Sequence, residues 1–181
     1  MKYNKTITLK NGTTLILRNG TKEDSNQALQ NFILTHSQTN FLRTYPEECT
    51  ITIQEESNYL QEKTDSKNEI EIVAEIDGKI IGTAGIESVG QSIKLRHRAD
   101  FGIGIDKAYW GLGIGSALTA ACIECAKKAG YKQLELDVVA ENTSAINLYK
   151  KFKFVEFGRN PKGFYSKTGK YQELIYMRLE L

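Results

Sequence analysis

The feature that most constrains this chain is a short strand followed by a glycine-rich turn and the start of a helix. The strand pattern covers Phe101 to Asp106, and the turn, Gly111-Leu-Gly-Ile-Gly-Ser116, carries glycines at alternate positions. Glycine has no Cβ atom to hold a ligand away from the backbone, and the first turn of a helix presents unpaired N–H groups with a partial positive charge. The pattern therefore predicts a cradle for an anion, such as the phosphate of a cofactor.

A helix after this turn is indicated by apolar residues at helical spacing. These residues are Ile114, Ala117, Leu118, Ala121, Cys122 and Cys125. Such a stripe docks a helix on a sheet, so we interpret its two cysteines as small buried hydrophobes rather than as a redox pair. The total of three cysteines is odd, which fits a reducing compartment. His36 and His97 add no metal-ligand spacing, and we expect no metal site.

Length and composition limit the class of protein. With 181 residues, 40% of them hydrophobic, the chain is long enough for one core, and we predict a single domain over residues 1–181. The net charge of +2 provides no basic field, so we expect no nucleic-acid partner. Because the sequence has no run of about 18 apolar residues, we expect no membrane association and a cytoplasmic location.

Hydrophobic periodicity and turn signals predict about seven strands and four helices. The strands are expected at Thr13–Arg18, Glu69–Ile76, Lys79–Glu87, Arg96–Asp106, Leu134–Val138, around Phe154 and at Tyr171–Leu179. The helices are expected from a cap at Thr21 through Ile33, at Ile53–Lys63, from the glycine turn to Gly130, and at Ser144–Lys151. Asp77-Gly78 is a strong hairpin signal. Gly102 and Gly104 within a strand indicate a bulge or a close backbone approach by a ligand.

A second constellation lies downstream of the glycine turn. Ala145, Leu148, Tyr149 and Phe152 share one helical face, and Asn142 stands just before the first turn. Asn142 is either a helix cap or a ligand-binding residue. Tyr149 is either a core aromatic or a functional group. The spacing alone leaves both alternatives open.

Together, the strand, the Gly-x-Gly-x-Gly turn and the later Asn-x-x-Ala-x-x-Leu-Tyr-x-x-x-x-Phe run resemble the GNAT superfamily of acyl-CoA-dependent N-acyltransferases. The sharp motifs lie between Asp100 and Phe154. The resemblance implies an α/β (α+β) fold with a mixed, mostly antiparallel sheet. It also implies a split between the strands at 96–106 and 132–138, in which acetyl-CoA, the acyl donor, would lie.

The same resemblance assigns roles to particular residues. It implies that Ile103, Gly104 and Ile105 pair through their backbones with pantetheine, that Asn142 contributes to cofactor binding, and that Tyr149 protonates the departing thiolate. The amides that would hold the pyrophosphate are those of Gly111, Leu112, Gly113, Ile114, Gly115 and Ser116. The family usually begins this turn with Gln or Arg, where Trp110 stands here. We expect this departure to alter the affinity for the cofactor more than the identity of the cofactor. Three lysines, Lys150, Lys151 and Lys153, are either solvated surface residues or groups that attract the outer phosphates of the cofactor.

Acetyl transfer requires a neutral amine, and an alkyl amine with a pKa of about 10.4 is mostly protonated near neutrality. A proton acceptor is therefore useful. We predict Asp100 in this role, with Glu87, His97 or a water molecule as alternatives. A backbone amide near Ile103 to Ile105 would stabilise the tetrahedral oxyanion.

Two other functions compete with N-acetyl transfer. A dinucleotide-dependent enzyme is disfavoured because the third glycine of the turn comes one residue early and too little chain follows Asp137 for the other half of such a fold. A non-catalytic acyl-CoA sensor would keep the cradle without an acid.

The amine acceptor is not identified by the sequence, and a small amine, an amino acid or its analogue, an antibiotic and a protein N-terminus all remain open. Position alone makes five residues candidates for its pocket: Phe41, Arg43, Tyr45, Phe164 and Tyr165. A homodimer through an exposed strand edge is also open.

Overall fold

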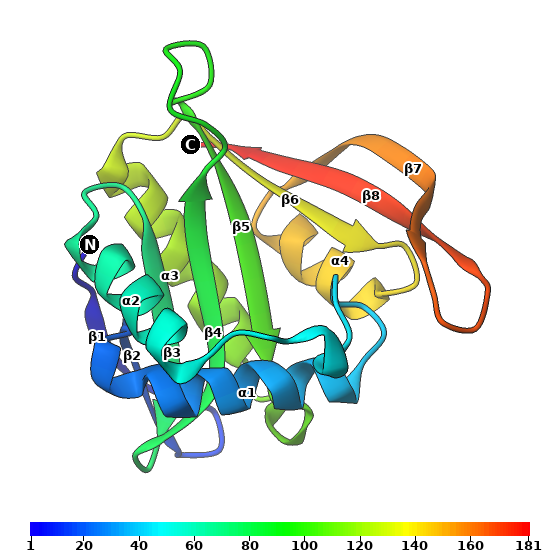
Figure 1. Cartoon of the computed structure of the whole chain (residues 1–181). Helices are drawn as coiled ribbons and strands as arrows, with labels where there is room; N and C mark the ends of the chain where they lie inside the picture. The colour runs from blue at the N-terminus through cyan, green and yellow to red at the C-terminus, as the bar shows by residue number, and fades with distance from the viewer.

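The architecture rests on one open sheet, seen in a computed structural model that describes residues 1–181. Its strands follow the order β1-β2-β3-β4-β5-β6-β8-β7 (Figure 1). They are β1 (Asn4–Thr8), β2 (Thr14–Asn19), β3 (Ile70–Ile76), β4 (Lys79–Ser88), β5 (Arg98–Ile105), β6 (Gln133–Val139), β7 (Val155–Tyr165) and β8 (Tyr171–Glu180).

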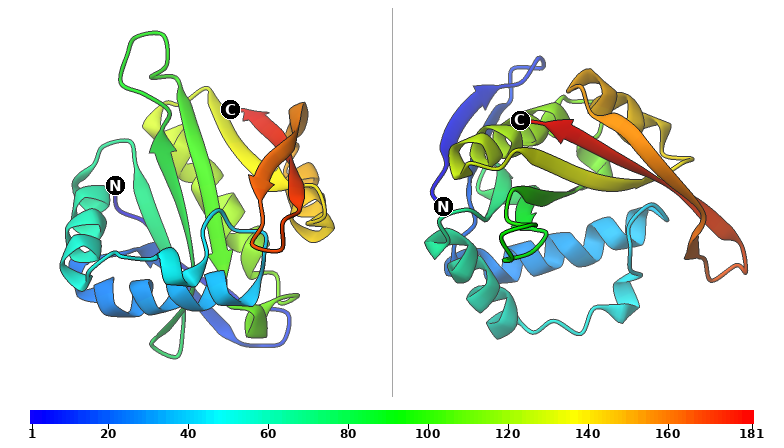
Figure 2. Two further views of the ribbon diagram at one scale, coloured as in Figure 1. Left: turned by 45° about the vertical axis from the view of Figure 1, so that its right-hand side comes forward. Right: turned by 90° about the horizontal axis from the view of Figure 1, so that it is seen from above.

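Helices cover both faces of the sheet. They are α1 (Ser25–Gln38), α2 (Ile53–Asp65), α3 (Ile114–Ala129) and α4 (Thr143–Lys151), with short 3₁₀ turns at Lys22–Asp24, Pro46–Glu48 and Lys107–Tyr109. The first two helices pack on one face, against β3, β4 and β5, and α3 packs on the other, against β2 to β5. Figure 2 shows the sheet between these two layers. None of the helices is both long and apolar enough to cross a lipid bilayer.

The sheet is antiparallel except where β5 meets β6. These two strands pair in parallel over three residue pairs, the last of which is Asp100 with Glu135. Beyond it, β5 stays paired with β4 up to Ile105, while β6 stays paired with β8 up to Val139. The two halves of the sheet therefore diverge, which confirms the predicted split.

Local signals in the sequence produce the expected turns and caps. Asp77 and Gly78 both have positive φ, 50° and 77°, as the two-residue turn of a hairpin requires. Thr52 caps α2, because its Oγ1 accepts a hydrogen bond from the Glu55 N–H at 3.2 Å. The first helix begins later than predicted, since the capped segment after Thr21 is a single 3₁₀ turn that precedes α1.

The strands differ from the prediction in three details. The sheet has eight strands rather than about seven, because β1 is polar and mostly exposed and lacks the apolar alternation of a half-buried strand. Gly102 and Gly104 do not form a bulge, since the pairing of β4 with β5 continues without a shift from Gly82–Ile105 to Ser88–Ala99. Strand β5 also begins at Arg98 rather than at Arg96. The Arg96 N–H instead closes a turn by donating to the Ser92 carbonyl.

The apolar stripe of α3 is buried as predicted. Ile114, Leu118 and Cys122 are at most 1% exposed, and Cys125 is 2% exposed. Burial raises the pKa of the Cys125 thiol to about 11 and also raises that of Cys122, so both thiols stay neutral near pH 7. The helix that follows the glycine turn is thus held by a dry apolar contact with the sheet.

Replacing Leu118 by alanine should lower the free energy of unfolding by about 2–5 kcal/mol, because the side chain is fully buried and a cavity would remain. Urea unfolding followed by circular dichroism measures this change. Ile33→Ala on α1 is the control, because Ile33 is 40% exposed, and it should cost well under half as much. Equal losses in the two variants would contradict this account of α3.

Candidate functional site

A cavity of about 380 Å³ lies at the mouth of the split, between the ends of β5, α3, α4 and α1. Most of the residues that the sequence singled out line it. They are Ile103, Gly104, Ile105, Gly111, Gly113, Ile114, Gly115, Ser116, Asn142 and Tyr149. Leu112 does not line the cavity, because its side chain packs against the core. The strand, the glycine turn and the downstream helix therefore meet at one site.

The glycine turn has the conformation that only glycine adopts without strain. Gly111 and Gly113 have φ values of 80° and 89°, and Gly113 is the N-cap of α3. A Cβ atom added at either glycine would meet no atom within 4 Å, so the space above the turn is open. Gly115 packs closely instead, since its Cβ would lie 3.2 Å from Leu148 Cδ2. The first turn of α3 thus opens on the cavity with its N–H groups uncovered, which suits an anion.

The backbone of β5 offers hydrogen-bonding groups to the split at alternate residues. Asp106 N donates to Ile81 O at 2.9 Å, and the register continues without a break toward Ser88. Because hydrogen-bonded pairs alternate along an antiparallel ladder, Gly104 directs its backbone groups to Thr83 on β4, whereas Ile103 and Ile105 direct theirs into the split. The backbone groups of Gly104 are therefore not available to a ligand, contrary to the prediction. What Gly104 provides is space, because it has no side chain.

Trp110 occupies part of this edge. Its indole Nε1 donates to the Ile105 carbonyl at 2.8 Å, and its ring is 48% exposed. The Ile105 carbonyl therefore has a partner, while the N–H of Ile105 and both backbone groups of Ile103 face the split. The residue that departs from the family pattern thus ends the row of groups available to a ligand.

Asn142 and Tyr149 each have the structural role that the sequence offered as one alternative, and each also lines the cavity. Asn142 caps α4, since its Oδ1 accepts from Ala145 N at 3.2 Å, and it also lines the cavity. Tyr149 is 6% exposed and packs edge-on against Phe101, with ring centroids 6.1 Å apart.

The Tyr149 hydroxyl has no hydrogen-bond partner in the protein. The one fully buried side-chain polar atom without a hydrogen bond is Arg178 Nε, so the Tyr149 hydroxyl is not fully enclosed, and Tyr149 lines the cavity. Burial and the nearby charge of Asp137 raise the pKa of Tyr149, which keeps its proton in place. Tyr149 is thus both a core aromatic and a proton-bearing group at the cavity.

None of the three sequence-predicted proton acceptors lines the cavity, and two of them lie together. Asp100 and Glu87 are register partners on β5 and β4, so their side chains share the face of the sheet on which α1 and α2 pack. Burial, together with the charges of Glu135 and Asp137, raises the pKa of Asp100. His97 is exposed in the loop before β5, and its side chain makes no hydrogen bond.

The loop between α1 and α2 is tied across this face to the far half of the sheet. Arg43 Nη2 lies 2.9 Å from Asp137 Oδ1 on β6, and the Lys167 N–H donates to the Tyr45 hydroxyl at 2.9 Å. Phe41 lines the cavity, whereas Arg43, Tyr45, Phe164 and Tyr165 do not. The lysines predicted for the outer phosphates, Lys150, Lys151 and Lys153, are exposed at the opposite end of α4 from Asn142.

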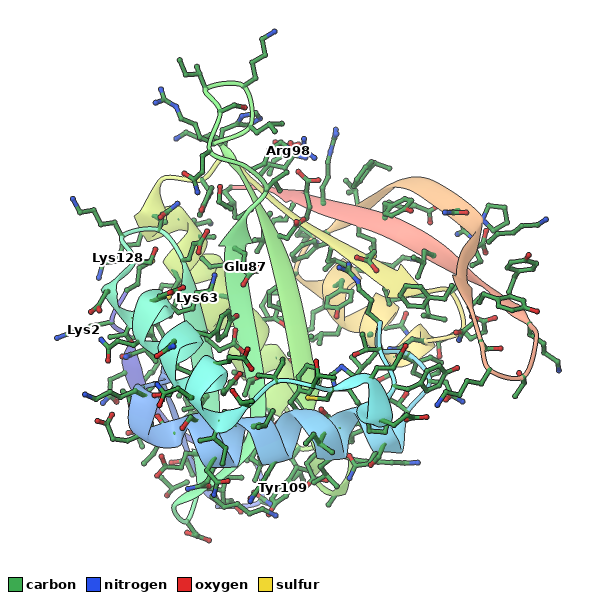
Figure 3. The ribbon with its side chains drawn as sticks, in the orientation of Figure 1. Lys2, Lys63, Glu87, Arg98, Tyr109 and Lys128 are labelled. Carbon is green, nitrogen blue, oxygen red and sulfur yellow. The ribbon has the colours of Figure 1, made fainter.

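Several residues of the site were missed by reasoning from the sequence. Thr35, Thr39 and Leu42 line the cavity from α1 and the loop after it, and Tyr109 lines it from the turn after β5. Figure 3 shows Tyr109 at the end of the molecule where α1 crosses the sheet. No local pattern marks these residues, and the docking of α1 on β4 and β5 is what brings the first three to the split.

Comparison with known proteins agrees with this geometry. A family model described as "Acetyltransferase (GNAT) family" matches residues 31–154. The L-amino acid N-acetyltransferase AaaT of Escherichia coli is 36% identical over 108 residues, which make up 59% of this chain and 65% of that protein. The chain spans less than two thirds of the length of the curated relatives it matches.

Solved structures show the same fold. An acetyltransferase of the GNAT family from Streptococcus pneumoniae is 30% identical, with a TM-score of 0.89 over 92% of this chain and 99% of that one. The yncA protein of Salmonella typhimurium, determined with its cofactor acetyl-CoA, is 18% identical, with a TM-score of 0.82 over 92% of this chain and 94% of that one. The matched residues include the cradle, the split and Tyr149, and the chain belongs to the GNAT acetyltransferase family.

Proposed function

We propose that this protein transfers the acetyl group of acetyl-CoA to the primary amine of a small acceptor by direct attack on the thioester. One observation carries the proposal: a single cavity joins the open N-terminus of α3 to the unpaired edge of β5 and to Tyr149. The cradle suits the pyrophosphate, because uncovered N–H groups and the helix dipole favour negative charge. The edge suits pantetheine, because an extended chain with amides can add to a strand.

Within this proposal, the thioester lies in the split beside Ile103. The Ile103 N–H faces the split, so it can donate to the oxygen that becomes negative in the tetrahedral intermediate. The amine approaches from the α1 and α2 face, where Asp100 and Glu87 attract a cation. Asp100 remains the proposed proton acceptor on β5 itself. Its raised pKa lies closer to neutral pH than that of an ordinary aspartate, which suits a general base.

Tyr149 is proposed as the donor to the departing sulfur. Its pKa is raised, and the pKa of a thiol is about 8.5, so complete proton transfer from tyrosine to thiolate is unfavourable. A hydrogen bond from the hydroxyl still stabilises the developing charge, and full protonation follows as the amine nitrogen gives up its second proton. We therefore assign Tyr149 an effect on turnover rather than on cofactor binding.

For the acceptor, L-amino acids stand first in our proposal. The Escherichia coli relative is named as an L-amino acid N-acetyltransferase, and Arg43 lies beside the carboxylates of this face, where an acceptor carboxylate can bind in place of Asp137. A panel of L-amino acids, their decarboxylated amines and short peptides, assayed with acetyl-CoA for release of free thiol, tests this assignment. Binding of CoA without transfer to any amine would instead favour the sensor.

Replacing Gly113 by alanine should weaken CoA binding at least about tenfold, because the N-cap conformation is strained for alanine and a methyl group enters the cradle. Isothermal titration calorimetry with CoA measures the loss. Gly130→Ala is the matched control, because Gly130 has a φ of 86° at the other end of α3 and also has open space around it. Both variants should lose similar stability. If the two variants bound CoA with equal affinity, the cradle would be refuted.

Replacing Tyr149 by phenylalanine should lower kcat about a hundredfold and leave the Kd for CoA nearly unchanged. Steady-state kinetics and calorimetry separate the two effects. Tyr131→Phe provides the control, because Tyr131 is 3% exposed, lies outside the cavity and accepts from Asn68 Nδ2 at 2.8 Å. An unchanged kcat in Tyr149→Phe would remove this hydroxyl from the mechanism.

A further inference from the structure

Two glycines on neighbouring strands, Gly85 and Gly102, leave a row without side chains between β3 and the split, here called the trough. Gly85 on β4 is the register partner of both Glu71 on β3 and Gly102 on β5. A Cβ added at Gly85 would collide with Glu71 Oε2, whereas one added at Gly102 would meet nothing within 4 Å. The Glu71 carboxylate therefore lies over Gly85 and points along the row toward Gly102, which borders the split.

This carboxylate is close to the proposed position of the amine. Neighbouring strands are about 4.8 Å apart, so a carboxylate over Gly85 is within one water molecule of a nitrogen over Gly102. Gly102 is exposed on this face, and Glu71 is partly exposed. No side chain from the floor blocks the path between them.

A hydrogen-bonded chain leads from Glu71 toward solvent. The Tyr59 hydroxyl on α2 lies 3.3 Å from Glu71 Oε2 and 3.1 Å from Glu87 Oε1. Lys63 Nζ then lies 2.9 Å from Glu87 Oε1 and 2.7 Å from Glu69 Oε2. Figure 3 shows Lys63 and Glu87 on the same face of the sheet, above α1. A proton on Glu71 thus has a route through Tyr59 to Glu87, which is half exposed.

The charges around Glu71 favour its neutral form near pH 7. Burial, together with the negative charges of Glu56 on α2 and Glu87 on β4, raises the pKa of Glu71 to about 7. Hydrogen bonds from Thr83 and Tyr59 oppose it without cancelling it. On the other face of the sheet, the buried Cys122 thiol of α3 stays neutral. A general base works best when its pKa lies near the working pH.

We propose that Glu71 is a further proton acceptor for the acceptor amine, reached along the trough over Gly85 and Gly102. This inference rests on the proposed function. In place of Asp100, the Glu71 carboxylate takes one proton from the ammonium group, and the nitrogen lone pair then forms the C–N bond. As the C–S bond breaks, the second nitrogen proton reaches the sulfur by way of Tyr149 and solvent. The proton on Glu71 leaves through Tyr59 and Glu87, so each turnover releases one proton.

Glu71→Gln tests the proposal, because glutamine keeps the shape and a hydrogen-bonding oxygen but cannot accept a proton. The assay uses acetyl-CoA and the most rapidly acetylated amine of the panel. In the unmodified protein, kcat/KM should rise with pH through about 7 as Glu71 ionises. In Glu71→Gln, kcat should fall about a hundredfold, and the rise should move to the pKa of the amine itself. Affinity for CoA should not change.

Gly85→Ala displaces the same carboxylate without removing its charge. The alanine methyl group would collide with the flexible end of Glu71, so the side chain moves away from the trough. Activity should fall, and combining Gly85→Ala with Glu71→Gln should cause no further loss, since both changes remove one function. Glu62→Gln is the control, because Glu62 is an exposed carboxylate on α2 without an ion pair, and it should have unaltered kinetics.

The outcomes separate this inference from the function on which it rests. If no amine of the panel is acetylated by the unmodified protein, the proposed function fails and the inference fails with it. If the unmodified protein is active and Glu71→Gln keeps its rise near pH 7, the inference alone is overturned. Loss of that rise in Asp100→Asn, with Glu71→Gln unaffected, would assign the proton to Asp100 instead.

Discussion

The site depends on the place where β5 and β6 stop pairing. A parallel pair normally continues until both strands end, but this one ends at Asp100 and Glu135, while β5 runs on to Ile105. The N–H of Ile105 and both backbone groups of Ile103 face the cavity without a partner in the protein, so an extended ligand with amides can pair with them. The indole N–H of Trp110 donates to the Ile105 carbonyl, so the row of backbone groups available to a ligand ends there.

Much of the framework could be predicted from the sequence, because it follows from local rules. The turn at Asp77-Gly78, the apolar stripe of α3 and the glycine cradle each combine a residue type with a spacing that admits few structures. The strand β1 could not be found in this way, because an exposed strand of polar residues carries no periodic signal. The position of the split came from the resemblance to a family and not from any pattern in the residues.

The candidate site was harder to predict, because parts of it depend on register. Whether Gly104 or Ile103 offers its backbone to the split is decided by which residue of β4 stands opposite, and a shift of one residue would reverse the answer. The position of Glu71 depends on two registers at once, that of β3 with β4 and that of β4 with β5. These strands are separated in sequence by turns and a long loop, so no local spacing links the residues.

Alternation along β5 divides the proposed chemistry between the two faces of the sheet. Phe101 packs with Tyr149, so the odd-numbered residues of the strand face α3 and α4. Asp100, Gly102 and Gly104 face the opposite side, where Glu71 and Glu87 also lie. Only at the split do neighbouring strands stop pairing, so that one thioester placed there can be reached from both faces. An amine can then lose its proton among carboxylates on one face while sulfur is stabilised by a hydroxyl on the other. Because the two groups lie on opposite faces, neither Asp100 nor Glu71 occupies the Tyr149 hydroxyl by hydrogen bonding before the substrates arrive.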